Sequence, residues 1–320
     1  MNKSNNNEPI FVVGMPRSGT TLMRYCLNQH SHIYIVPETN FFETVYGNRQ
    51  IIPEAKISEN IDKLLSKLMG FTYQDADMHL LKEFFPLKDV LAQEIKDKAQ
   101  NYRDIATIVF SKFAKEKGKQ RWGEKTPRHL FFIDQIYDFF PNAKIITMET
   151  SAKNTIASNF KSNHIRTGFL DNCVLYKKCL DYARKYQDKI LIVKYEDLTR
   201  NPESTLKKVC EYIGEEFEPQ MLNPGMIDSS YNNENIIHDR QLAIQPDDEN
   251  KWKKALDDYQ SQFINYTVLQ EKNTNSNIDR LQFYQDVLKM KAKQVYFEIQ
   301  LTKNRLGYEN VKRILANDWT

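Results

Sequence analysis

Three short apolar runs rich in β-branched residues punctuate the chain, at residues 9–13, 143–148 and 189–195. Each run is bounded by turn-forming or polar residues, a pattern typical of buried strands. Apolar side chains at helical spacing follow the first run over residues 21–30, and a further helix is expected at about 202–213. Strands separated by helical stretches predict an α/β fold, a three-layer domain built on a parallel sheet.

The remaining segments are mainly helical in pattern. Residues 50–120 are rich in Lys, Glu, Leu and Phe, which predicts a helical insertion, whereas Pro, Asn, Asp and Ser gather in 218–250 and predict a long loop. We therefore expect a disordered N-terminus at 1–8, one domain at 9–272 and a C-terminal helical extension at 278–320. The extension is expected to pack as an additional helix, with a homodimer contact as the alternative.

Composition favours a soluble protein of the cytoplasm. The 320 residues include 45 basic and 42 acidic side chains, a balance that gives no reason to expect nucleic acid or an anionic membrane as the main partner. The four cysteines show no CxxC pair and no zinc-ligand spacing, as is typical of reduced intracellular thiols. No run of about 18 apolar residues predicts a membrane span, and no signal-peptide pattern precedes the first strand.

The segment Gly14-Met-Pro-Arg-Ser-Gly-Thr-Thr21 predicts a phosphate-binding loop between the first strand and the first helix. Its glycines let the backbone approach a ligand, and the free N–H groups at the start of the helix attract anions. Arg17 adds a fixed positive charge, and Ser18, Thr20 and Thr21 add hydroxyl donors. A tight turn with a capping hydroxyl is the structural alternative. In an ATPase or kinase loop a lysine would stand at Thr20, so those activities are disfavoured.

This loop and several later motifs resemble those of the sulfotransferases that use 3′-phosphoadenosine 5′-phosphosulfate (PAPS). The likeness is to the branch that includes tyrosylprotein sulfotransferases and bacterial enzymes, and it covers roughly residues 9–215. It continues through His30-Ser31, Pro37-Glu38-Thr39, Trp122-Gly-Glu-Lys-Thr-Pro-Arg128 and Tyr195-Glu-Asp-Leu198. The resemblance implies an α/β enzyme that transfers a sulfuryl group from PAPS to an acceptor hydroxyl, in a reaction that needs no metal.

The resemblance also implies roles for individual residues. Glu38 corresponds to the general base, Lys125 to a lysine that stabilises charge in the transition state, and Arg17 to the contact with the 5′-phosphate. An exposed turn carboxylate and a solvated lysine are the structural alternatives for the first two, and packing under a helix is the alternative for Tyr195. The residues expected to contact the nucleotide are Pro16, Arg17, Ser18, Gly19, Thr20, Thr21, Ser158, Tyr195 and Lys251.

One part of the nucleotide motif departs from the family. In the family an arginine and a serine eight residues later hold the 3′-phosphate of PAPS; this chain keeps Ser158 but has Thr150 in place of the arginine. Loss of a guanidinium group removes charge-assisted hydrogen bonds worth about 1.5–3 kcal/mol each. Lys153, Lys161 and Arg166 are the candidates to replace it.

Three functions are therefore compatible with the sequence. The first is PAPS-dependent sulfuryl transfer, the second is a related reaction with another donor or without PAPS, and the third is a non-catalytic nucleotide-binding module. The acceptor is open among small-molecule, glycan, lipid and peptide hydroxyls, and a small metabolite is favoured. His30, His32 and His129 lie near the matched motifs, but their spacing defines no metal site and no metal is expected.

Overall fold

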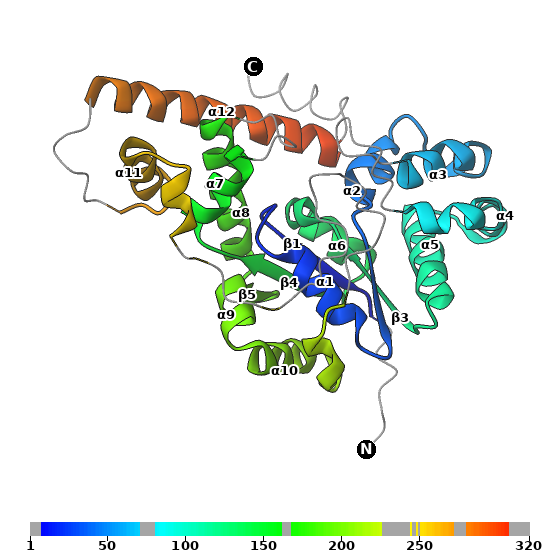
Figure 1. Ribbon diagram of the computed structural model, residues 1–320. Coiled ribbons are helices and arrows are strands. Elements are labelled where there is room, and N and C mark those ends of the chain that lie inside the picture. The colour runs from blue at the N-terminus through cyan, green and yellow to red at the C-terminus, as the bar shows by residue number, and fades with distance from the viewer. Residues whose placement is uncertain are drawn as a thin grey trace.

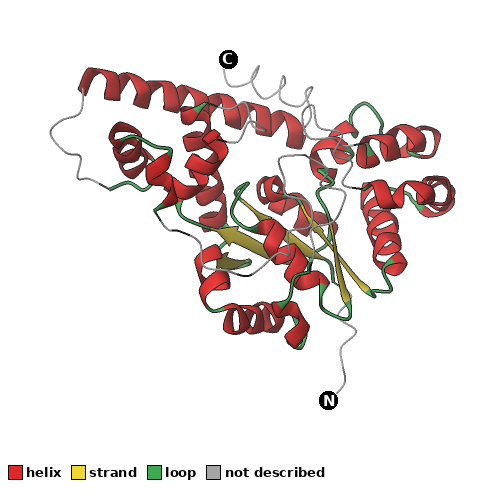
Figure 2. Ribbon diagram, in the orientation of Figure 1, coloured by secondary structure: helices red, strands yellow, loops and turns green. Residues whose placement is uncertain are grey.

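A five-stranded parallel sheet forms the centre of the molecule, and helices cover both of its faces (Figures 1 and 2). The computed structural model describes residues 8–70, 81–161, 168–225, 244, 248, 250–271 and 280–306. The strands, in the spatial order β2-β3-β1-β4-β5, are β1 (Ile10–Gly14), β2 (Ile33–Val36), β3 (Arg121–Lys125), β4 (Lys144–Glu149) and β5 (Leu191–Lys194). The predicted three-layer α/β class is confirmed.

Helices of very different length connect and surround these strands. They are α1 (Thr20–Asn28), α2 (Phe41–Thr44), α3 (Ile61–Met69), α4 (Lys88–Lys98), α5 (Tyr102–Glu116), α6 (Ile133–Phe139), α7 (Ala152–Lys161), α8 (Phe169–Lys185), α9 (Tyr195–Arg200), α10 (Pro202–Ile213), α11 (Asp258–Thr267) and α12 (Arg280–Leu306). Short 3₁₀ turns lie between them, among them η5 (Pro127–Phe132) and η7 (Lys251–Lys254). None of the described helices is long and apolar enough to cross a bilayer.

The central strand β1 is buried on both faces because its side chains alternate between two cores. Phe11 and Val13 belong to the core shared with α5 and α8. Ile10 and Val12 belong to the core shared with α1 and α10. Full burial of each such side chain stabilises the fold by about 1.5–3 kcal/mol. The sheet is therefore a rigid platform for the loops at its edge.

Strands β2 and β3 were not among the predicted strands. In β3 three of the five side chains are charged, yet all five residues are buried. Arg121 shows how: its guanidinium donates to the Glu8 carbonyl oxygen at 2.7 Å and to Glu215 Oε1 at 2.9 Å. The strands were predicted from short apolar runs, so β3, whose charged side chains are buried through hydrogen bonds and ion pairs, was not detected.

The edge strand β2 is covered by two side chains of α1. Arg24 Nε donates to the Ile35 carbonyl oxygen at 3.1 Å, and the Ile35 backbone N–H donates to Asn28 Oδ1 at 2.6 Å. These contacts occupy the backbone groups that a foreign strand would otherwise pair with. Arg24 and Asn28, four residues apart on α1, therefore protect the open edge of the sheet.

Other boundaries follow the sequence closely. Helix α10 coincides with the predicted 202–213, with a proline at its first position and Gly214 in the left-handed conformation at its end. The strand predicted at 189–195 is shorter, because Tyr195 begins α9. In the predicted extension, α12 contributes Phe283 and Met290 to the same core as Phe11. The expected disordered N-terminus and most of the expected loop at 218–250 lie outside the described residues.

Candidate active site

The candidate residues come together at one edge of the sheet. Because all five strands are parallel, their carboxyl ends meet at this edge. The loop at residues 14–21 follows β1, Lys125 ends β3, and Glu38 stands two residues beyond β2. On the other side of β1, Thr150 follows β4 and Tyr195 follows β5.

The loop between β1 and α1 has an unusual backbone, with three positive φ values in six residues. Gly14 and Gly19 have φ values of 144° and 91°, which side-chain-bearing residues rarely adopt. Arg17 also has a positive φ, 71°, and such a strained non-glycine conformation is characteristic of ligand-binding loops. Ser18 Oγ is buried and has no hydrogen-bond partner among the described residues. A buried hydroxyl of this kind fits a loop that receives an anion.

Tyr195 packs directly on this loop. A Cβ atom added to Gly19 would lie only 2.4 Å from Tyr195 Cδ2, so the aromatic ring closes the space that the missing side chain leaves. Thr20, the first residue of α1, is buried, while Thr21 and Pro16 are half-buried. The ring therefore packs against the loop at Gly19, and its contact with a nucleotide stays a prediction.

Arg17 reaches across to α7. Its Nε donates to Ser158 Oγ at 3.4 Å, and the guanidinium is exposed. Arg17 and Ser158 are therefore neighbours, although they are 141 positions apart in the chain. From the sequence, Arg17 was expected at the 5′-phosphate of the nucleotide and Ser158 at the 3′-phosphate.

Glu38 and Lys125 form an ion pair beside the loop. Lys125 Nζ donates to Glu38 Oε1. The lysine side chain is fully buried and the glutamate side chain is 10% exposed. A buried ammonium group requires a paired carboxylate, because desolvation of an uncompensated charge costs several kcal/mol. The pair therefore places the Glu38 carboxylate at the boundary between the core and solvent.

A second carboxylate, Glu124, lies beneath this pair and holds the segment that carries Glu38. Glu124 Oε1 accepts hydrogen bonds from Thr39 Oγ1 at 2.8 Å, from the Thr39 backbone N–H at 3.1 Å and from Thr126 Oγ1 at 2.5 Å. Its Oε2 lies 2.9 Å from Nδ1 of His129. Burial acts to raise the pKa of Glu124, but the charge and hydrogen bond of His129 and the two threonine hydroxyls outweigh it, so the pKa is lowered.

The sequence analysis did not assign a role to Glu124 or Thr126. Thr126 Oγ1 also accepts the backbone N–H groups of Thr39 and Asn40, both at 3.2 Å, so the residues after Glu38 are fixed from two sides. The motif Trp122–Arg128 could have indicated a role for Glu124. Glu124 and Lys125 are adjacent in it, so on a strand their side chains point to opposite faces.

Thr150, which stands where the family has an arginine, is hydrogen-bonded to the carboxylate of Glu196. Thr150 Oγ1 donates to Glu196 Oε1 at 2.6 Å, and the Ser151 backbone N–H donates to the same oxygen at 3.2 Å. The Thr150 carbonyl oxygen accepts from Tyr176 OH at 2.5 Å. The start of α7 is therefore tied to α9 by an anionic side chain rather than by a cationic one.

Of the cations proposed to replace the arginine, Lys153 is held elsewhere. Its Nζ lies 4.6 Å from the centroid of the Trp252 ring, and the Trp252 backbone N–H donates to Asn154 Oδ1 at 3.1 Å. The turn η7, which begins at Lys251, therefore docks on α7. The side chain of Lys161 and the whole of Arg166 lie outside the described residues.

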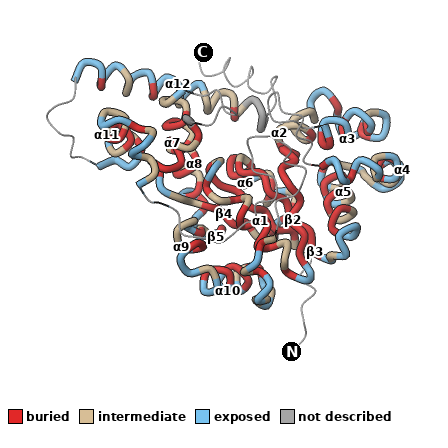
Figure 3. Tube along the Cα trace, viewed as in Figure 1, coloured by how far each residue is buried: buried red, intermediate tan, exposed pale blue. Residues whose placement is uncertain are grey.

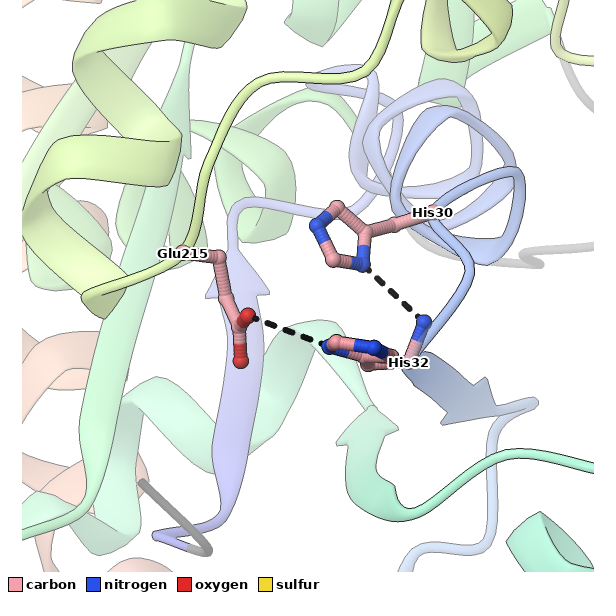
Figure 4. A group of neighbouring side chains, drawn as sticks. All are labelled: His30, His32 and Glu215. Carbon is pink, nitrogen blue, oxygen red and sulfur yellow. Dashed lines mark hydrogen bonds and ion pairs between the residues drawn. The ribbon is translucent and has the colours of Figure 1, made fainter. Parts of the chain in front are cut away.

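Two of the candidate histidines lie at the opposite, amino edge of the sheet with Glu215 (Figure 4). Their possible ligand atoms are within 4.8 Å of one another. His30 Nδ1 accepts the His32 backbone N–H at 3.1 Å, and His30 Nε2 lies 3.0 Å from the Glu216 carbonyl oxygen. Because both nitrogens of His30 have protein partners, the cluster is explained by hydrogen bonds that join two loops. The sequence spacing did not reveal that Glu215 completes it.

Comparison with known proteins connects this site to one family. The model of the "Sulfotransferase family" matches residues 9–219. The chain is 25% identical over 218 residues to a protein-tyrosine sulfotransferase of Drosophila melanogaster and 24% identical over 228 residues to protein-tyrosine sulfotransferase 2 of Gallus gallus. These matches cover 64% and 67% of the chain, and the chain spans only 37% and 53% of the length of the two relatives.

The fold also matches a solved structure. The sulfotransferase domain from the Synechococcus PCC 7002 olefin synthase is similar with a TM-score of 0.51 and 20% sequence identity. The similarity covers 90% of this chain and 97% of that domain.

Proposed function

Because the chain belongs to the sulfotransferase family, we propose that it transfers a sulfuryl group from PAPS to the hydroxyl of a small-molecule, glycan or lipid acceptor. The observation that carries this proposal is the Glu38–Lys125 pair at the carboxyl edge of the sheet, next to the phosphate-binding loop. Glu38, Lys125 and the loop at 14–21 lie at the ends of the neighbouring strands β2, β3 and β1, which supports adjacent roles as proton acceptor, cation and anion site. A cytoplasmic location is part of the proposal, since all four cysteines are unpaired.

In the proposed reaction Glu38 accepts the proton of the acceptor hydroxyl. The acceptor oxygen forms a bond to sulfur while the bond between sulfur and the bridging oxygen of the donor breaks, and the 5′-phosphate leaves with that electron pair. Lys125 and the backbone N–H groups before α1 stabilise the charge that develops on the bridging and phosphate oxygens, and Arg17 binds the phosphate. Much of the rate then comes from the position in which Glu38 is held.

Fit to the donor is supported on the 5′ side by features of the loop itself. The left-handed glycines leave room for a phosphate against the backbone, and the buried Ser18 Oγ is a donor without a protein partner among the described residues. The other proposed nucleotide contacts, Ser158 and Tyr195, border the same loop. Lys251 belongs to the turn that docks on α7, where it would close over the nucleotide.

A second candidate is favoured by the contact between Thr150 and Glu196. A carboxylate at the 3′-phosphate position repels a dianion, whereas the family has an arginine there. The site would then use a donor without a 3′-phosphate, or catalyse a reaction that does not need PAPS, or bind a nucleotide without catalysis. This candidate keeps the loop and the Glu38–Lys125 pair and changes only the donor.

Calorimetric titration with 3′-phosphoadenosine 5′-phosphate, compared with adenosine 5′-phosphate, separates the two candidates. A clear preference for the 3′-phosphorylated ligand supports PAPS, and equal affinity or no binding supports the altered donor. The variant Thr150→Arg should raise the preference about tenfold or more, because one charge-assisted hydrogen bond is worth about 1.5–3 kcal/mol.

The role of Glu38 is tested by turnover with PAPS and a panel of hydroxylated acceptors. Glu38→Gln should lower the rate by about 10²–10⁴ and leave nucleotide affinity unchanged. Glu43→Gln is the matched control, since Glu43 lies on the same segment and pairs with Arg128. Full turnover in Glu38→Gln would remove this residue from the mechanism.

A further inference from the structure

The side chain of Arg17 leaves the loop at residues 14–21 and ends beside α7. The backbone of Arg17 has a φ of 71°, and its Nε lies 3.4 Å from Ser158 Oγ. Helix α7 is buried along most of its length, whereas Ser158 is only half-buried, so its hydroxyl lies at an accessible point of the helix (Figure 3). One guanidinium group therefore joins the loop after β1 to the helix after β4.

The start of α7 is unfavourable for the 3′-phosphate of PAPS. Thr150 stands where the family has the arginine of its 3′-phosphate pair, and Ser158 stands where it has the serine. The Thr150 hydroxyl and the Ser151 backbone N–H both donate to Glu196 Oε1, at 2.6 and 3.2 Å. Because that carboxylate repels a phosphate dianion, the phosphate would lie farther along α7, toward Ser158. The use of PAPS therefore needs a cation near Ser158.

Arg17 meets this need better than Lys153 does. Lys153 Nζ lies over the Trp252 ring, 4.6 Å from its centroid. The exposed guanidinium of Arg17 has Ser158 as its hydrogen-bond partner through Nε, and neither Nη1 nor Nη2 has a partner in the part of the chain that the structure describes. Both Nη groups can donate to phosphate oxygens, and the Ser158 hydroxyl can accept from Nε while it donates to the same phosphate.

We propose that Arg17 and Ser158 together bind the 3′-phosphate, so that Arg17 replaces the arginine that the chain lacks at position 150. This inference rests on the proposed use of PAPS. The two phosphates belong to one ribose, and a side chain that starts in the 5′-phosphate loop and ends beside Ser158 would contact both. The backbone N–H groups before α1 hold the 5′-phosphate from the other side. Selectivity for PAPS then depends on the loop after β1 rather than on the start of α7.

The first test compares the affinities of wild type and Arg17→Gln for 3′-phosphoadenosine 5′-phosphate and adenosine 5′-phosphate by calorimetry. Wild type should prefer the 3′-phosphorylated ligand. Arg17→Gln should lower this preference about tenfold or more, because a charge-assisted contact with the 3′-phosphate is lost. Loss of a contact with the 5′-phosphate weakens both ligands alike and leaves the preference unchanged. Adenosine 3′-phosphate, which has no 5′-phosphate, should also bind Arg17→Gln about tenfold more weakly than wild type.

Arg128→Gln is the matched control for this comparison. Arg128 follows the end of β3 and is an exposed arginine like Arg17, but its Nε donates to Glu43 rather than to α7. Arg128→Gln removes the same charge from the protein and should leave the preference for the 3′-phosphorylated ligand unchanged. The control therefore separates a direct contact from a general effect of net charge. Circular dichroism checks that each variant is folded.

The second test asks whether Arg17 and Ser158 hold the same phosphate. Ser158→Ala should lower the preference for the 3′-phosphorylated ligand in wild type and add little to the loss in Arg17→Gln, because residues that share one partner have non-additive effects. Thr150→Arg, which returns the arginine to its position in the family, should raise the preference of Arg17→Gln again by about tenfold.

Three outcomes would overturn the inference. If Arg17→Gln weakens both ligands equally, Arg17 contacts the 5′-phosphate alone. If the preference survives in Arg17→Gln but is lost in Lys161→Gln or Arg166→Gln, one of those residues holds the 3′-phosphate instead. Both results leave the proposed transfer from PAPS intact. If wild type has no preference for the 3′-phosphorylated ligand, the inference fails together with the proposed use of PAPS.

Discussion

The buried ion pair between Glu38 and Lys125 gives the sharpest prediction about stability. Glu38→Gln keeps the shape of the side chain but removes the carboxylate that pairs with a fully buried ammonium group. Removal of one partner of a buried pair costs about 3–5 kcal/mol in the free energy of unfolding. Lys125→Met should cost less, about 1–3 kcal/mol, because the Glu38 side chain is 10% exposed and water can reach its carboxylate.

The double variant Glu38→Gln/Lys125→Met contains neither charge and should therefore be more stable than Glu38→Gln alone. The two losses are then non-additive, with a coupling free energy of about 1–3 kcal/mol between the two sites. Glu43→Gln is again the matched control, since its partner Arg128 is 42% exposed. A pair of that kind is worth at most about 1 kcal/mol.

Equilibrium unfolding in urea, followed by the fluorescence of the three tryptophans, measures all four variants against wild type. The reasoning is refuted if Glu38→Gln costs no more than Glu43→Gln. It is also refuted if the losses of the two single variants simply add in the double variant, because Lys125 would then not depend on the charge of Glu38.

Three further predictions concern the Glu124 carboxylate, the loop glycine Gly19 and the buried thiols. The pKa of Glu124 is lowered in the folded protein, so its stabilising effect is complete above the pKa of the unfolded chain and is lost as pH falls through the folded pKa. Glu124→Gln should accordingly cost most at neutral pH and least below about pH 4, as urea unfolding across pH can show. Gly19→Ala should abolish nucleotide binding because its Cβ would lie 2.4 Å from Tyr195; Gly118→Ala, with a φ of 68° and nothing within 4 Å of its Cβ, should leave binding intact in the same titration. Burial raises the pKa values of all four thiols, so a thiol reagent monitored by absorbance should modify them slowly before unfolding and rapidly in urea: Cys26, Cys173, Cys179 and Cys210.

The sequence predicted several parts of the fold that are buried through apolar contacts, although the short apolar strand β2 was missed. Strands β1 and β4 carry their own signals as short apolar runs, and helix α10 has apolar residues at helical spacing. Strand β3 could not be found in this way. Its buried Arg121 is hydrogen-bonded to the Glu8 carbonyl oxygen and to Glu215, which is 94 residues later, and no local pattern contains that information.

The same distinction holds within the site. The loop at 14–21 and Glu38 belong to recognisable motifs, so their place at one edge of the sheet was expected. The carboxylate beside Thr150 was not expected, because Glu196 is 46 residues away and reaches it only through the packing of α9 against the end of β5. A substitution in a motif can be seen in the sequence, whereas the group that replaces the lost contact depends on tertiary structure.

The order of the strands separates the two halves of the proposed chemistry. Glu38 follows β2 and Lys125 ends β3 on one side of β1, whereas Thr150 and Tyr195 follow β4 and β5 on the other side. The network of Glu124, which fixes the segment after Glu38, shares no hydrogen bond with the contact between Thr150 and Glu196 among the described residues. A change at the end of β4 can therefore alter which donor binds while the geometry of proton transfer is kept. For this reason the loss of the arginine bears on the donor and its affinity rather than on whether the site can activate a hydroxyl.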